Sequence, residues 1–137
     1  NFLIKKSTFI TLKFDENIRQ YGHEDTLFGL AMKSKGINII HIDNPLIHMG
    51  LEPNKDYLKK VEISLHMLKS MKADLKDTSS LLYLVDKLES YRLTPCIRLM
   101  HKLLSKLEIK NLTSSLPMLW ILNLYKLGYY ISINEVK

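Results

Sequence analysis

The sequence has little cysteine, glycine or proline, and it has no long apolar run. A single cysteine, Cys96, among 137 residues excludes an intramolecular disulfide framework and a cysteine-rich zinc site. Five glycines and four prolines exclude a collagen-like chain and a proline-rich linker. The most apolar stretch, residues 116–130, contains Asn123 and Lys126 and is shorter than the roughly 20 residues that a bilayer span needs. We expect a buried or interfacial helix there.

Composition and charge indicate a globular chain with anionic partners. Apolar residues make up 46% and charged residues 25%, which is typical of one ordinary domain or a piece of a larger one. The net charge of +6 favours phosphates, nucleic acid or acidic lipid surfaces. The basic residues are scattered and do not alternate with aromatic ones, so we expect no nucleic-acid binding. The first residues read as a strand and do not resemble a signal peptide, which predicts a cytoplasmic chain cut from something longer.

The chain divides near residues 50–54. Before this point, short apolar runs rich in β-formers predict strands at 2–4, 9–10 and 37–42 around one helix at 24–35, which ends at Gly36. After it, apolar residues at three- and four-residue intervals predict helices over about 53–72, 81–91, 94–107 and 117–128. We therefore expect a helix-rich α+β fold, with residues 1–52 as one unit and residues 53–137 as a helical extension of about four helices.

The densest polar cluster is Tyr-Gly-His-Glu-Asp-Thr at residues 21–26, where the first helix is predicted to start. Glu24 and Asp25 would meet the positive end of the helix dipole, which favours the ionised carboxylate. An ionised carboxylate can act as a general base toward a hydroxyl group. Acidic residues in a first turn are also common stabilisers of the helix itself, so both interpretations remain open.

A second cluster places His41, Asp43 and His48 around the end of the predicted strand at 37–42. Imidazole and carboxylate groups together suit Mn, Fe or Zn. The spacing of these residues matches no common metal-binding motif, so histidines that are hydrogen-bonded in a loop are the alternative.

Taken in order, the clusters resemble bacterial family-2 glycosyltransferases. The segments that carry the resemblance are Phe-Asp-Glu-Asn-Ile at 14–18, Tyr-Gly-His-Glu-Asp-Thr-Leu-Phe-Gly at 21–29 and His-Ile-Asp-Asn-Pro-Leu-Ile-His-Met-Gly-Leu-Glu at 41–52. The resemblance covers roughly residues 1–72. It implies that residues 1–52 are the C-terminal portion of a GT-A-type α/β catalytic domain. It also implies inverting transfer of a sugar from a nucleotide-sugar to a hydroxyl acceptor, in bacterial surface polysaccharide or glycan synthesis.

The resemblance also implies roles for individual residues. Asp25 would be the catalytic base, with Glu24 beside it as a possible ligand of the acceptor. His48 would join the shell of a divalent cation, Mn or Mg, which stabilises the leaving diphosphate in the full-length enzyme. The acceptor pocket would be shaped by three consecutive residues: Tyr21, Gly22 and His23.

The family's nucleotide-binding half and its Asp-x-Asp metal motif are absent from these 137 residues. We therefore predict that the chain alone is inactive. Because the missing half would leave an apolar face uncovered, we expect either self-association or a compact chain held together mainly by the helices after Pro53. The expected partners of the full-length enzyme are a nucleotide-sugar donor, a sugar or lipid-linked acceptor and an anionic surface at the inner membrane face. The alternative is a non-enzymatic helical interaction module, or a degenerate transferase remnant used for binding.

Overall fold

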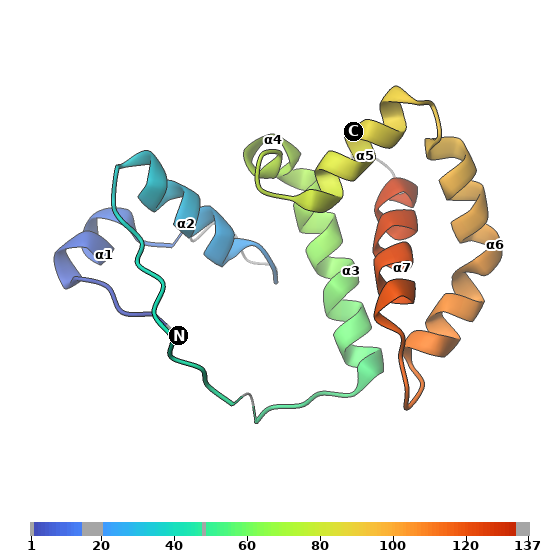
Figure 1. The fold of residues 1–137 in the computed structure, drawn as a ribbon, viewed down its shortest axis with the longest axis horizontal. Helices are drawn as coiled ribbons and strands as arrows, with labels where there is room; N and C mark the ends of the chain where they lie inside the picture. The colour runs from blue at the N-terminus through green and yellow to red at the C-terminus, as the bar shows by residue number, and fades with distance from the viewer. Residues whose placement is uncertain (1, 15–20, 48, 134–137) are drawn as a thin grey trace.

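A computed structural model describes residues 2–14, 21–47 and 49–133 (Figure 1). Every regular element within these ranges is an α-helix. The helices are α1 (Lys6–Leu12), α2 (Glu24–Ser34), α3 (Asn54–Ser70), α4 (Lys72–Leu75), α5 (Ser80–Ser90), α6 (Thr94–Leu112) and α7 (Leu119–Ser132). The short pair α1 and α2 lies at one end of the molecule, and α3 to α7 form a bundle at the other (Figure 1). A long connection without helix joins α2 to α3.

The expected α+β fold is wrong for the part of the chain that the structure describes. Phe9 and Ile10 lie inside α1, and residues 37–42 run without pairing to a strand. A run of β-formers is a weak signal by itself, because a strand needs neighbours that accept its hydrogen bonds and cover one face. Here the apolar side chains of Ile40 and Ile42 remain 82% and 75% exposed. The described residues therefore contain no GT-A-type sheet.

The helices expected after Pro53 are present, but two of their ends differ from the prediction. The helix predicted to end near residue 107 continues to Leu112, and the last helix passes through Gly128 to Ser132. Gly128 does not end α7. Instead, its missing side chain allows a close approach to α6, since a Cβ atom at Gly128 would lie 2.6 Å from the Cβ of His101.

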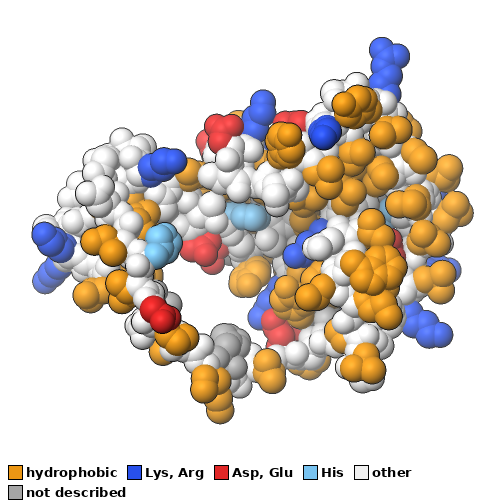
Figure 2. Space-filling view, in the orientation of Figure 1, with side chains coloured by type: hydrophobic (Ala, Val, Ile, Leu, Met, Phe, Trp, Pro, Cys, Tyr) orange, Lys and Arg blue, Asp and Glu red, His pale blue; other side chains and the backbone are white. Residues whose placement is uncertain are grey.

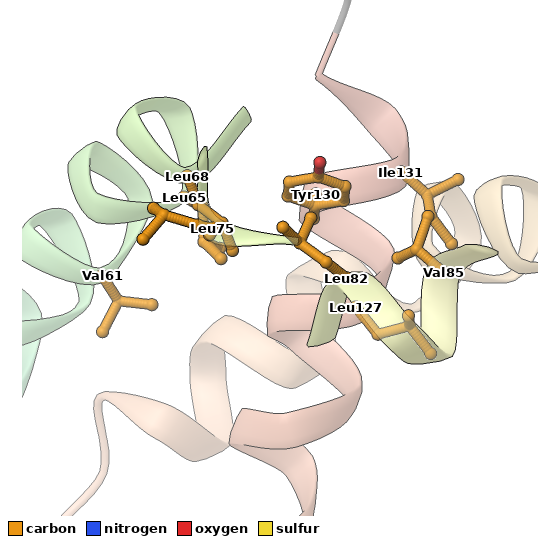
Figure 3. Close-up of a cluster of buried hydrophobic side chains, with 9 residues drawn as sticks. All are labelled: Val61, Leu65, Leu68, Leu75, Leu82, Val85, Leu127, Tyr130 and Ile131. Carbon is orange, nitrogen blue, oxygen red and sulfur yellow. The ribbon is translucent and has the colours of Figure 1, made fainter. Parts of the chain in front are cut away.

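The core of the bundle joins α3, α4 and α5 to α7 (Figure 3). It consists of nine buried residues: Val61, Leu65, Leu68, Leu75, Leu82, Val85, Leu127, Tyr130 and Ile131. Fully burying a leucine is worth about 1.5–3 kcal/mol relative to leaving it exposed, so this cluster is the main source of the bundle's stability. The apolar residues of α3 lie at the three- and four-residue spacing that predicted the helix. Within the described ranges, no helix is both long and apolar enough to cross a bilayer.

The helix α2 connects the N-terminal pair to this bundle. On one side, the Phe28 ring of α2 stacks on Phe14, with 4.4 Å between ring centroids, and Phe9 of α1 packs on the same ring. On the other side, Leu27 and Leu30 pack against the core of the bundle. These contacts bring the first turn of α2 against α3 and so position the cluster at residues 21–26.

Candidate functional site

The turn before α2 is shaped by two residues with left-handed backbone angles. Gly22 has φ +118° and His23 has φ +67°. Gly22 is buried, and a Cβ atom there would lie 2.7 Å from the hydroxyl oxygen of Ser64 on α3. Glycine adopts such angles without steric cost and leaves room for this contact. Glycine at this position therefore allows the turn to pack directly on α3.

The two predicted catalytic carboxylates lie in the first turn of α2, as the sequence indicated, and they make different contacts. Glu24 Oε2 accepts a hydrogen bond from the backbone N–H of Gly22 at 2.9 Å, which closes the turn. Asp25 Oδ1 accepts hydrogen bonds from the backbone N–H and the hydroxyl of Thr26, at 2.7 and 3.3 Å. Both side chains satisfy donors near the helix start, where the dipole favours negative charge. Asp25 is exposed, and its role as a base remains a prediction.

Side chains of α3 meet the turn from the other side. The Ser64 hydroxyl lies 3.2 Å from His23 Nε2. Lys60 Nζ lies 5.7 Å from the centre of the Tyr21 ring, within the range of a cation–π contact. The same ammonium group contacts Glu52 Oε2 at 2.6 Å, and the hydrogen bond that it donates to this carboxylate raises the pKa of Lys60. Lys60 therefore stays protonated beside the turn.

These residues line an open cavity of about 740 Å³. The lining near the turn comes from the turn itself, from α2 and from α3, and consists of Tyr21, His23, Thr26, Tyr57, Lys60 and Ser64. The rest of the lining is largely apolar and comes from α3, from residues 75–84 and from α7: Val61, Leu65, Leu68, Leu75, Thr78, Ser79, Ser80, Leu81, Leu84, Asn123, Lys126 and Leu127. Two of the three predicted acceptor-pocket residues, Tyr21 and His23, therefore line a cavity, whereas Gly22 supports the turn behind them. Glu24 and Asp25 are not among the residues that line it.

The predicted metal site involves His48 and the neighbouring His41 and Asp43. His48 lies outside the described residues. His41 is exposed on the connection between α2 and α3. The described ranges contain no group of three or more His, Cys, Asp or Glu side chains placed to hold a metal ion. Binding of Mn or Mg by His48 therefore stays a prediction.

Sequence reasoning missed the wall of the cavity that α3 provides. Tyr57, Lys60 and Ser64 follow one another at intervals of three and four residues, so they share one face of the helix. This polar row beside the buried stripe was a signal that could have been noticed. What no local pattern shows is that the start of α2, about forty residues earlier in the chain, packs over this row.

A second polar cluster lies within the bundle. His101 Nδ1 and Glu108 Oε2, both on α6 and both buried, lie 2.9 Å apart. The Tyr125 hydroxyl donates a hydrogen bond to Glu62 Oε1 at 2.5 Å. Burial, and after it this hydrogen bond, raises the pKa of Tyr125 above its ordinary value. None of these four residues lines the cavity described above, and the cluster joins α3, α6 and α7.

Comparisons with models of known protein families, with curated proteins and with solved structures each give no match. The resemblance to family-2 glycosyltransferases therefore stays a prediction made from the residues of the three quoted segments. Of these segments, three residues, Tyr21, His23 and Thr26, line the cavity, and residues 41–47 lie on the connection between α2 and α3. The polar part of the cavity combines phenol, hydroxyl, imidazole and ammonium groups, a set that can bond a ligand with hydroxyl groups, and leucine and valine side chains line the rest.

Proposed function

We propose that this chain supplies the acceptor-binding part of an inverting glycosyltransferase, which moves a sugar from a nucleotide-sugar to a hydroxyl acceptor in bacterial surface polysaccharide or glycan synthesis. The supporting observation is that Tyr21 and His23, from a segment resembling that family, line a cavity together with Tyr57, Lys60 and Ser64. Its volume of about 740 Å³ lies in the range of small-molecule sites. The hydroxyl, imidazole and ammonium groups can bond sugar hydroxyls, and the phenol rings offer apolar faces to a sugar ring.

The proposed chemistry uses Asp25 as the base. The acceptor hydroxyl loses its proton as it attacks the anomeric carbon, the bond to the nucleoside diphosphate breaks, and the configuration inverts. Thr26 lines the cavity, so an acceptor bound there reaches the residue next to Asp25. Asp25 would have to exchange its hydrogen bonds with Thr26 for one with the acceptor. A positioned general base contributes about 10²–10⁴-fold to the rate.

The test is sugar transfer by the full-length gene product with a matched pair of substitutions. Asp25→Asn should lower kcat by about 10²–10⁴-fold and change the free energy of unfolding by less than about 1 kcal/mol. Asp56→Asn is the control, because Asp56 is also an exposed carboxylate in the first turn of a helix, here α3. This control should leave kcat unchanged. Retention of activity in Asp25→Asn would show that Asp25 only stabilises the helix start.

Binding to the cavity can be tested with this chain by itself. We expect no sugar transfer by it, because the Asp-x-Asp motif of the family is absent from its sequence. Saturation-transfer NMR with simple hexoses should nevertheless show contact with the protein, and Tyr57→Ala should weaken it. Tyr83→Ala is the control, because Tyr83 is 70% exposed and does not line the cavity. Equal signals from the two variants, or sugar transfer by the chain alone, would contradict the proposal.

A second candidate function is a helical interaction module without enzymatic activity. It is favoured by large apolar side chains that α6 and the start of α7 leave exposed, among them Leu103 at 71% and Leu119 at 78%. On this hypothesis the acidic pair of α2 serves only the helix start. The Asp25→Asn and Asp56→Asn variants would then have indistinguishable effects in every assay of the full-length protein.

A further inference from the structure

The outer surface of α6 carries an apolar row beside a basic row. The apolar row consists of three leucines at four-residue intervals, Leu99, Leu103 and Leu107, which are 58%, 71% and 65% exposed. The basic row has the same spacing and is also exposed: Lys102, Lys106 and Lys110. Residues four apart lie on the same face of a helix, so the two rows run side by side along most of α6.

Large apolar side chains are also exposed on the turn between α6 and α7 and in the first turn of α7. Leu116, Leu119 and Trp120 are 82%, 78% and 61% exposed there. In the space-filling view, hydrophobic side chains gather over the half of the molecule that α6 and α7 occupy, with Lys and Arg side chains among and beside them (Figure 2). We call the three leucines of α6 together with Leu116, Leu119 and Trp120 the α6 surface.

Most of the net positive charge of the chain lies in α6 and α7, the helices that carry this surface. Residues 94–132 contain five basic side chains and one acidic side chain, so they account for four of the net charge of +6. The acidic residue, Glu108, is buried against His101 at 2.9 Å. No exposed carboxylate therefore offsets the lysine row within this stretch.

We propose that the α6 surface docks on an anionic lipid bilayer, with α6 lying in the plane of the headgroups. Leucines on one side and lysines on the other are the pattern of a helix that rests at the interface, with its apolar side chains reaching the acyl boundary. Trp120 suits the headgroup level, since its ring is apolar and its N–H is polar. The lysine row would lie against the lipid phosphates. This inference does not depend on sugar transfer, because the α6 surface and the cavity share no residue.

Charge argues for a bilayer as the occupant and against a second copy of the chain. In a symmetric dimer formed through this surface, each lysine row would face the same basic surface with no exposed carboxylate to pair with it. Like charges brought together in this way oppose association. An anionic bilayer supplies both the negative charge and the apolar layer that the two rows require.

The test is co-flotation of the full chain with phosphatidylcholine vesicles that contain phosphatidylglycerol, compared with phosphatidylcholine alone. We expect strong binding to the anionic vesicles, weak binding to the neutral ones and a decrease with salt. Leu103→Glu should lower the partition coefficient by about tenfold or more. Leu51→Glu is the control, because Leu51 is also exposed, at 92%, but lies outside the α6 surface. Lys106→Gln should weaken binding to the anionic vesicles by about fivefold. Its control is Lys55→Gln on α3, which should leave binding unchanged.

Trp120 provides an independent readout. It is the only tryptophan of the chain, so a blue shift of its fluorescence on addition of anionic vesicles reports this surface alone. Circular dichroism establishes that each variant is folded, and the lysine variants still test the surface if Leu103→Glu does not fold. The proposal is overturned if the chain does not float, or if Leu103→Glu and Leu51→Glu bind vesicles equally. It is also overturned if sedimentation shows a dimer that Leu103→Glu dissociates, which would identify the surface as a contact between copies.

Discussion

Replacing Gly128 with alanine should destabilise the protein, although the same change inside a helix usually stabilises it. Alanine is favoured over glycine in a helix interior by about 1 kcal/mol. Gly128 lies inside α7, however, and a Cβ atom there would come within 2.6 Å of both Cβ and Cγ of His101 on α6. Carbon atoms normally approach to about 3.5–4.0 Å. A Cβ atom is fixed to the backbone, so the two helices would have to separate.

The magnitude follows from setting the two effects against each other. Over-packing a well-packed interior costs about 1–3 kcal/mol and occasionally more. Here the cost should lie at the upper end, because His101 is buried and its ring is held 2.9 Å from Glu108. After the helix-propensity gain is subtracted, we expect a net loss of about 2 kcal/mol in the free energy of unfolding. For a chain of this size the loss corresponds to a fall in Tm of about 8 °C.

Urea unfolding followed by circular dichroism measures this loss, and Gly29→Ala is its matched control. Gly29 also lies within a helix, α2. Apart from its chain neighbours and the nearby backbone of α2 itself, no atom lies within 4 Å of the position that its Cβ would take. We therefore expect Gly29→Ala to be neutral or to stabilise by up to about 1 kcal/mol. If Gly128→Ala is as stable as the unmodified chain, α6 and α7 do not approach as closely as the structure shows and the reasoning fails.

Three further outcomes follow from the site and the bundle. Gly22→Ala should cost about 1–3 kcal/mol in backbone strain alone, with added overlap on Ser64, and hydrogen exchange of α2 should speed up more than that of α7. Tyr125→Phe removes the hydrogen bond to Glu62 and should lower the free energy of unfolding, measured in urea, by about 1.5–3 kcal/mol. Tyr129→Phe removes only an exposed contact with His66 at 3.4 Å and should lower it by less than about 0.5 kcal/mol. The raised pKa of Tyr125 means that its phenol stays protonated in the folded state. The contribution of Tyr125 to stability should therefore be constant below the ordinary tyrosine pKa of 10.0 and fall above it, so that the loss of stability above this pH is shallower in Tyr125→Phe.

The helical half of the fold was predictable because its signals are local. In α3, the spacing of Leu58, Val61, Leu65 and Leu68 is the spacing of one helix face, and all four side chains are buried. In α5, Ser79 caps the helix start and accepts a hydrogen bond from the backbone N–H three residues later. Patterns that a single helix satisfies by itself can be read without knowing the tertiary structure.

The strands and the end of α7 were not predictable for the opposite reason. Residues 37–42 have the composition of a strand, but pairing depends on a second segment, and the described ranges offer none. Gly128 reads as a helix stop, and only its contact with His101 shows why glycine stands inside α7. In both places the presence or absence of a tertiary contact overrides the local conformational preference.

The same distinction applies to the candidate site. The cluster at residues 21–26 and its place at a helix start follow from the sequence, and the structure confirms that place. The opposite wall depends on Gly22 and His23 meeting Ser64, about forty residues later, and on α2 packing against the core. Local sequence could therefore indicate one side of the cavity but not that a cavity exists.

The α6 surface and the cavity share no residue, but both include residues of α7. Trp120 belongs to the α6 surface, and Asn123, three residues later, lines the cavity. Three residues correspond to a rise of about 4.5 Å along a helix, so a bilayer at the level of Trp120 would lie close to this part of the cavity. An acceptor attached to a lipid could then enter the cavity while its anchor stays in the membrane. We therefore expect anionic vesicles to favour lipid-linked acceptors over free sugars in the full-length enzyme. Leu103→Glu should remove that preference and leave transfer to free sugars unchanged.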